Sequence, residues 1–148
     1  MLFSKTTGYA VRALAYLTTF GEGVHIPVSR IAAETDVPTP FLGKIVQRLV
    51  KAGILVTRKG PGGGVGLARP ADRIDLFELV VATEGDALWQ HCVLGLDTCS
   101  DDRPCPLHSD WMEIREEIRH MLQGKTLADV ATLVRNGSSR IRNLPATK

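Results

Sequence analysis

Apolar side chains recur at helical spacing through most of the chain, which predicts a mainly helical fold. Residues 6–20 predict a first helix, which Gly21 ends, and residues 28–34 predict a second, shorter one. A third helix is expected from Thr39 to about residue 52. Thr39 is placed to cap this helix, and Pro40 suits a first turn, where a missing N–H costs nothing. Its buried stripe is expected to consist of Leu42, Ile45, Val46 and Leu49.

The second and third of these helices, joined by a tight turn, are typical of a helix-turn-helix. The pattern then changes, because residues 54–57 and 65–68 predict two strands joined by the glycine-rich turn RKGPGGG. A hairpin in this place is a wing. It is not a phosphate-binding nucleotide loop, since it lacks the lysine–serine ending and leads into a strand. The candidate DNA-binding residues are Thr39, Pro40, Phe41, Lys44, Gln47, Arg48, Arg58, Lys59, Gly60, Pro61 and Gly62.

The second half of the chain is expected to be helical on both sides of a polar loop. Asp75 starts one helix, with Glu78 in the capping-box position, and the helix ends near Gly85. Ser109 starts a long helix, residues 126–134 form a short one, and the tail from residue 136 is expected to be disordered. The apolar stripe of the long helix can pack on its own domain or form a dimer seam. Its members are Trp111, Ile114, Ile118, Met121 and Leu122.

The loop between these helices holds all three cysteines of the chain, in the segment CVLGLDTCSDDRPCPLH. A polar loop of this kind cannot bury enough apolar surface to order itself, so a bound metal is expected to hold it. An iron–sulfur cluster suits the intervals better than structural zinc, which usually begins with a Cys-x(2–4)-Cys knuckle. Zinc and three free cysteines remain alternatives, and a disulfide would leave one cysteine unpaired. The candidate ligands are Cys92, Cys99, Cys105 and His108.

Charge divides the chain in two. Residues 1–70 carry nine Lys/Arg and three Asp/Glu, whereas residues 71–148 carry nine and thirteen. A basic first half predicts a polyanion-binding module, although a basic solvated surface is the alternative. The expected organisation is a winged helix-turn-helix over 1–70, a cluster loop with dimerisation helices over 71–134 and a basic tail over 135–148. No apolar run is long enough to span a membrane, and Arg12 argues against a signal peptide, so a cytoplasmic protein is expected.

Several segments together resemble the iron–sulfur-linked winged-helix repressor family, which includes regulators of cluster homeostasis and sensors of nitric oxide. The segments are SKTTGYAVRAL, PTPFLGKIVQRLVKAGIL, RKGPGGGVGLARP, IDLFELVVATEG and the three cysteines before a long helix, and they span residues 1–134. The resemblance implies a homodimer with crossed long helices that binds a palindromic operator in double-stranded DNA, with affinity set by the cluster.

The resemblance supports some of the candidate cluster ligands more closely than others. The three cysteines match the family's cluster ligands, although the interval from Cys92 to Cys99 is one residue longer than usual. His108 matches the fourth ligand of the homeostasis branch. The nitric-oxide branch uses an aspartate near the N-terminus of the other subunit, where this chain has Gly8. The recognition helix begins differently from those of relatives, so the operator sequence does not transfer.

A mostly α fold with a small β-hairpin is therefore expected, and its function is that of a transcription regulator. A [2Fe–2S] cluster is preferred to [4Fe–4S], with zinc as the alternative. A small iron–sulfur redox protein is the rival, but it would need neither a wing nor a basic N-terminal half. No nucleophile–base set indicates an enzyme, and no small-molecule substrate is expected.

Overall fold

The computed structural model describes residues 2–136 of the chain. It confirms a helix-rich fold with one antiparallel hairpin, β1–β2, in which Leu55 pairs with Leu67 and Arg58 with Gly64. The tail beyond residue 136, expected to be disordered, lies outside the described residues. The elements in chain order are α1 (Lys5–Thr18), α2 (Val28–Thr35), α3 (Thr39–Lys51), β1 (Leu55–Arg58), β2 (Gly64–Leu67), a 3-10 turn η1 (Ala71–Arg73), α4 (Leu76–Glu84), α5 (Ala87–Gln90), α6 (His108–Gln123) and α7 (Leu127–Arg135).

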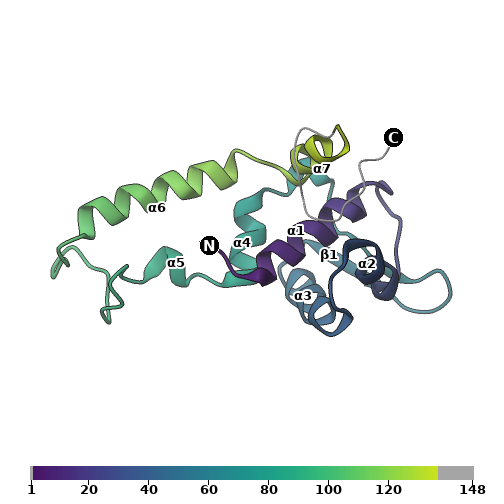
Figure 1. Ribbon diagram of the computed structural model, residues 1–148, viewed down its shortest axis with the longest axis horizontal. Coiled ribbons are helices and arrows are strands. Elements are labelled where there is room, and N and C mark those ends of the chain that lie inside the picture. Colours follow the sequence, from purple (N-terminus) through teal and green to yellow (C-terminus); the bar gives the residue numbers. More distant parts are fainter. Residues whose placement is uncertain (1, 137–148) are drawn as a thin grey trace.

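The main core forms around α1, which α2, α3, α4 and α7 surround (Figure 1). Ala10 and Leu14 of α1 are fully buried there, and small alanines on this face let the neighbouring helices approach closely. The core does not stop at the expected boundary near residue 70, because Ile74, Leu79 and Leu127 belong to it. The helix-turn-helix therefore packs as one body with α4 and α7.

Three helix ends compare directly with the sequence predictions. α3 ends at Lys51, close to the expected residue 52, and Gly53 follows it with a φ of 73°, the left-handed conformation that a glycine after a helix end readily adopts. Asp75 caps α4 as predicted, since its carboxylate accepts the Glu78 N–H at 2.8 Å. The prediction for Thr39 was wrong: Pro38 occupies the N-cap position and Thr39 is already helical, with no side-chain cap. The extended backbone that Pro38 adopts, with its preset φ, starts the helix instead.

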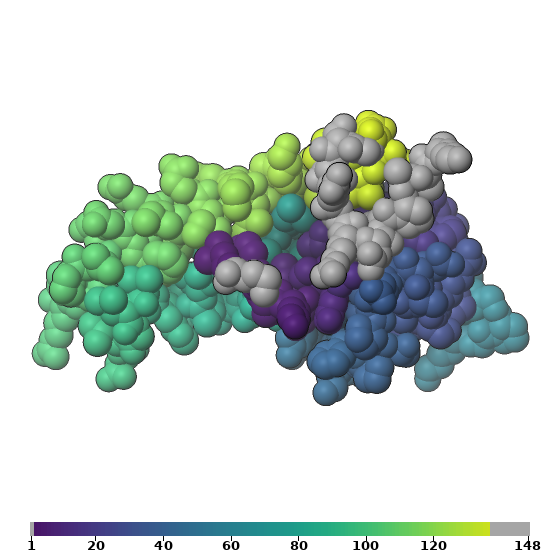
Figure 2. All heavy atoms as spheres, viewed as in Figure 1, coloured from purple at the N-terminus to yellow at the C-terminus, as the bar shows by residue number. Residues whose placement is uncertain are grey.

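A smaller lobe projects from this body. In Figure 1, α6 runs away from the other helices, with α5 and the cysteine loop beneath it at the end opposite the hairpin tip, and Figure 2 shows the two parts as unequal lobes. Val80, Trp89 and Leu122 are buried in a separate small core at the base of this lobe. α5 was not predicted from the sequence, because a helix of four residues is too short to show a periodic pattern. The edge-on contact of Trp89 with Phe77, at 4.9 Å between ring centroids, holds it.

No helix among residues 2–136 has the length and apolar character needed to cross a bilayer.

The hairpin packs closely against the segment before α2, and glycine makes this contact possible. Gly64 has a φ of 144°, and a Cβ there would lie 2.3 Å from the Ile26 carbonyl. Val65 and Ile26 exchange backbone hydrogen bonds of 2.8 and 2.9 Å at the same place. We therefore expect Gly64→Ala to lower the free energy of unfolding by about 2 kcal/mol or more.

Urea denaturation measures this loss. Gly8→Ala is the matched control, since a Cβ at this exposed position in α1 would meet no atom within 4 Å. That change should raise stability by up to about 1 kcal/mol. A Gly64→Ala protein as stable as its parent would contradict the close approach of the hairpin.

Candidate DNA-reading surface and cysteine loop

The outward side of α3 is polar and basic, while its inward side is apolar. Leu42, Ile45, Val46 and Leu49 are buried, as predicted. The side chains of Lys44 and Gln47 lie on the exposed side. A Cβ at Gly43 would meet nothing within 4 Å, so the middle of this helix is open to close approach by another molecule.

An exposed aromatic ring marks the first turn of α3. Phe41 has 58% of its surface exposed, yet its ring is held in place by Tyr9 of α1, at 6.4 Å between centroids. Tyr9 in turn lies under the Arg12 guanidinium, at 4.9 Å, and Arg12 donates a 3.1 Å hydrogen bond to the Thr35 carbonyl. The stack fixes one flank of the predicted recognition helix to α1 and α2.

The hairpin tip is the second basic surface. All of residues 58–62 are exposed, and Gly60 and Gly62 have φ values of 85° and 72°, which a residue with a side chain rarely adopts. None of the ion pairs recorded within residues 2–136 involves α3 or the hairpin. The charges of Lys44, Arg58 and Lys59 are therefore free of acidic partners there, as phosphate binding requires.

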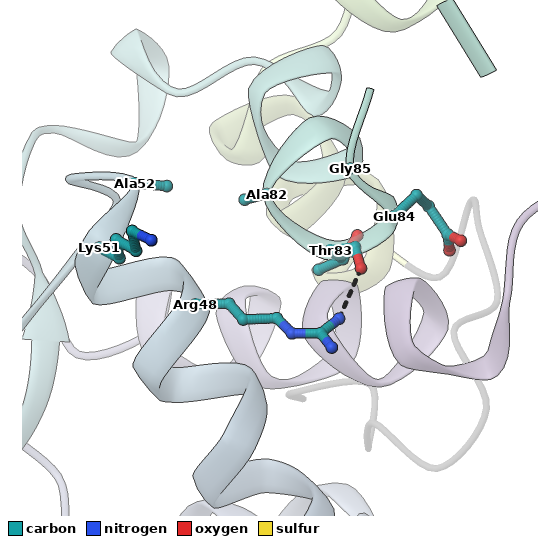
Figure 3. Close-up of a pocket in the computed structure, with 7 residues that line it drawn as sticks. All are labelled: Arg48, Lys51, Ala52, Ala82, Thr83, Glu84 and Gly85. Atoms are coloured by element: carbon teal, nitrogen blue, oxygen red, sulfur yellow. Dashed lines mark hydrogen bonds between the residues drawn. The ribbon is translucent and has the colours of Figure 1, made fainter. Parts of the chain in front are cut away.

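Arg48 differs from the other candidate DNA contacts. Its Nη1 donates a 2.8 Å hydrogen bond to the Thr83 carbonyl, so its guanidinium is directed toward the last turn of α4 (Figure 3). An open pocket of about 450 Å³ lies beside this link, between the C-terminal ends of α3 and α4. Arg48 lies on the outward side of α3, as predicted from the sequence. It is, however, on the part of that side that faces α4.

The structure brings the candidate metal ligands together only in part. Cys92 is buried, and His108, in the first turn of α6, is 8% exposed. The Cys99 Sγ lies 3.4 Å from Nδ1 of His108, while Nε2 of the same ring lies 2.8 Å from a carboxylate oxygen of Asp101. The His91 side chain is exposed and outside this group.

The thiols also interact with one another. Backbone N–H groups of Leu94 and Leu96 lower the pKa of Cys92, and the Cys105 thiol adds to this effect against the cost of burial. Burial raises the pKa of Cys105, and the neighbouring charges of Cys92 and Cys99 raise it further. Several thiolates at one place repel each other, so a cation would relieve the repulsion.

The donor set fits an iron–sulfur cluster by its chemistry. Within residues 2–136, no group of three or more His, Cys, Asp or Glu side chains is positioned closely enough to hold a single metal ion. The four candidates nevertheless form two contacting pairs, Cys92 with Cys105 and Cys99 with His108, and the charge of Cys99 acts on Cys105. Three soft thiolates and an imidazole on one loop are suitable ligands for iron in such a cluster.

The predicted apolar stripe of α6 divides between two sides. Ile118 and Leu122 pack into the small core with Trp89, whereas Ile114 and Met121 are 52% and 58% exposed. The Trp111 side chain donates to the His91 carbonyl at 3.3 Å and so ties α6 to the end of α5.

Arg115 of α6 is a buried residue that was not predicted from the sequence. It is only 6% exposed, and its Nε and Nη1 have no acceptor among the described residues. Arg115 lies one turn before Ile118 and two turns before Leu122, so helical spacing alone could have placed it on the inward side of α6.

Comparison with known proteins decides the family. A family profile described as "Iron-dependent Transcriptional regulator", that of Rrf2, matches residues 3–133. The chain belongs to the Rrf2 family. It is 35% identical over 136 residues to a protein of Aquifex aeolicus (strain VF5) that bears the name of an HTH-type transcriptional regulator, covering 90% of this chain and 93% of that protein. It is 28% identical over 144 residues to the HTH-type transcriptional regulator IscR of Erwinia tasmaniensis, covering 93% and 87%.

Solved structures show the same fold. IscR of T. potens superimposes with a TM-score of 0.72 at 21% identity, over 93% of this chain and 90% of that one. The global cysteine regulator CymR of B. subtilis gives 0.70 at 21% identity, over 88% and 95%. This Rrf2 protein is therefore a DNA-binding transcriptional regulator with a winged helix-turn-helix, and it is not an enzyme.

The two basic surfaces lead to different expectations for single substitutions. Lys59→Ala, at the wing, should weaken binding to any duplex about three- to tenfold and reduce the slope of log affinity against log salt by about one. Gln47→Ala, on α3, should mainly relax sequence preference, by about 1–3 kcal/mol at one base pair. Fluorescence anisotropy with specific and scrambled duplexes at several salt concentrations separates the two. Affinity of the parent that does not fall with salt would contradict a phosphate-binding surface.

Proposed function

We propose that this Rrf2 protein controls transcription through an iron–sulfur cluster held by Cys92, Cys99, Cys105 and His108. The observation that supports this most directly is the contact of Cys99 with His108 Nδ1, which joins the loop to the first turn of α6. Similarity to regulators named IscR and the iron-dependent description of the family agree with it. A bound cluster supplies thiolate-ligated iron that responds to oxidants and nitric oxide.

The chain's own residues prepare the loop for this role. The Leu94 and Leu96 amides stabilise the ionised form of Cys92, the form in which a thiol binds metal. Asp101 bonds Nε2 of His108, which holds the ring with Nδ1 toward Cys99. We expect [2Fe–2S] rather than [4Fe–4S]. Structural zinc on the same four ligands is the second candidate, because thiolates and imidazole suit it as well.

The visible absorption spectrum of anaerobically purified protein, with iron, sulfide and zinc analysis, tests this function. His108→Ala should keep the fold but bleach faster in air, since one corner of the cluster loses its protein ligand. His91→Ala is the control and should behave like the parent, because that imidazole lies outside the group. Equal air stability of the His108→Ala protein and the parent would remove the histidine from the site, and zinc without sulfide would favour the second candidate.

We further propose that two copies associate through α6 and bind a palindromic operator. Ile114 and Met121 give this helix an exposed apolar edge, and the buried Arg115 has nitrogens without acceptors among the described residues. In such a dimer each α3 would enter a major groove, and each wing, with Lys59 to Gly62, would lie at the adjacent minor groove.

Light scattering of exposed-residue variants tests the dimer. Ile114→Glu would place an unpaired charge in the seam, at a cost of several kcal/mol, and should give a folded monomer. Ile118 is unsuitable for this purpose, because it packs in the chain's own small core. Leu133→Glu, at another exposed apolar position on α7, is the control and should leave the dimer intact. A dimeric Ile114→Glu protein would place the seam elsewhere.

A further inference from the structure

The last turn of α4 is bonded to the first turn of α1. One carboxylate oxygen of Glu84 accepts hydrogen bonds from Ser4 N at 2.8 Å, Ser4 Oγ at 2.7 Å and Thr7 Oγ1 at 2.5 Å. Ser4 is the N-cap of α1 but caps no N–H with its own side chain. Glu84 therefore places a negative charge at the positive end of α1, where the helix dipole favours it, and satisfies the backbone N–H of Ser4.

The same turn of α4 is also bonded to α3. Thr83 shares a buried hydrogen bond of 2.7 Å with Thr7, and its carbonyl accepts from Arg48 Nη1 at 2.8 Å. Figure 3 shows Arg48 reaching across to Thr83 while the Glu84 side chain points away from it. Two adjacent residues thus hold α1 on one side and the DNA-reading helix on the other.

The charge of Glu84 is maintained by these contacts. Burial alone would raise the pKa of its carboxyl group, but hydrogen bonds from Thr7 and Ser4, together with the charge of Arg48, outweigh burial and lower it. The carboxylate is therefore ionised throughout the neutral range. The network is charged and hydrogen-bonded on both sides, and such networks resist partial opening.

A short path leads from this turn to the cysteine loop. Gly85 ends α4, and α5 follows, held on α4 by the contact of Trp89 with Phe77. The buried Cys92 comes two residues after α5. Movement of the first cysteine would therefore act on α5, which packs on the first turn of α4 through Phe77 and is joined through Gly85 and Asp86 to the last turn, where α1 and α3 are bonded.

We propose that Thr83 and Glu84 form the joint through which the state of the cysteine loop reaches the DNA-reading helix. Arg48 is the link from this joint to α3, and so it is a positioning residue rather than a contact to DNA. This inference rests on the proposed function and adds to it the route by which the loop acts. A purely structural network would affect stability but not the response of α3 to the loop.

The test compares two forms of the full-length protein, cluster-loaded and cluster-free, by the ratio of their dissociation constants for one operator. For the parent, we expect the two dissociation constants to differ by about tenfold or more. For Glu84→Ala and Arg48→Met, we expect them to differ by no more than about twofold, while both variants keep the cluster spectrum of the parent. Glu22→Ala, which removes an exposed carboxylate from the turn between α1 and α2, is the control and should keep the ratio of the parent. Loss of a simple DNA contact at Arg48 would weaken both forms equally and leave the ratio unchanged.

Hydrogen exchange of the α3 amides gives a second readout that needs no cluster. Alkylation of the loop thiols with N-ethylmaleimide should change exchange in α3 of the parent, and this change should fall about fivefold in Glu84→Ala. Arg48→Met keeps the bonds from Glu84 to α1, so it replaces Glu84→Ala if that protein does not fold. If the parent assembles no cluster, the proposed function is wrong, and hydrogen exchange of the α3 amides alone tests whether Thr83 and Glu84 form the joint. A response of α3 in both variants equal to that of the parent, or no response in the parent, overturns the joint.

Discussion

The burial of α1 is the constraint on which the other elements depend. Ala10 and Leu14 have no exposed surface, and the helix-turn-helix, the hairpin and α7 all contribute to the core around them. The DNA-reading surface is consequently one face of a single packed body. Its basic side chains project from a rigid support, which is the arrangement that groove recognition requires.

The smaller lobe is held differently. Its own core is small, and it joins the main body through α4 and the linker to α7. Few buried apolar contacts make a region easier to displace, so the cysteine loop lies in the part of the molecule best able to change. The proposed sensing function would benefit from this division, because the body that carries α3 would keep its shape while the cysteine loop changed.

Polar contacts add to the apolar packing where α4 meets α1 and α3. The bonds of Thr83 and Glu84 to Ser4, Thr7 and Arg48 lie at the end of α4 nearest the loop. Hydrogen bonds have stricter geometry than apolar contacts, so a network of them can pass a small shift of α4 to α1 and α3 while the core remains intact. The same chemistry explains why Arg48, exposed and basic, is turned from the expected DNA surface toward a carbonyl.

The sequence by itself determined the features that arise from local preferences. The buried stripe of α3, the left-handed Gly53 and the glycine-rich hairpin were predictable, because helical periodicity and backbone steric limits act over a few residues. The cysteines and His108 remain predicted ligands, recognised from their residue types and their spacing in one short loop. Helix ends were predicted less accurately: besides the error at Thr39, α1 ends at Thr18 rather than residue 20, and α6 begins at His108 rather than Ser109.

Tertiary structure alone decided which surfaces meet. Arg48 donates a hydrogen bond to a carbonyl 35 residues away in the chain, and α5 is held on α4 by the contact of Trp89 with Phe77. The inward side of α6 includes the buried Arg115, which no apolar pattern would select. These outcomes depend on the distances between elements far apart in the chain, and periodicity in one segment carries no information about the segment that will pack against it.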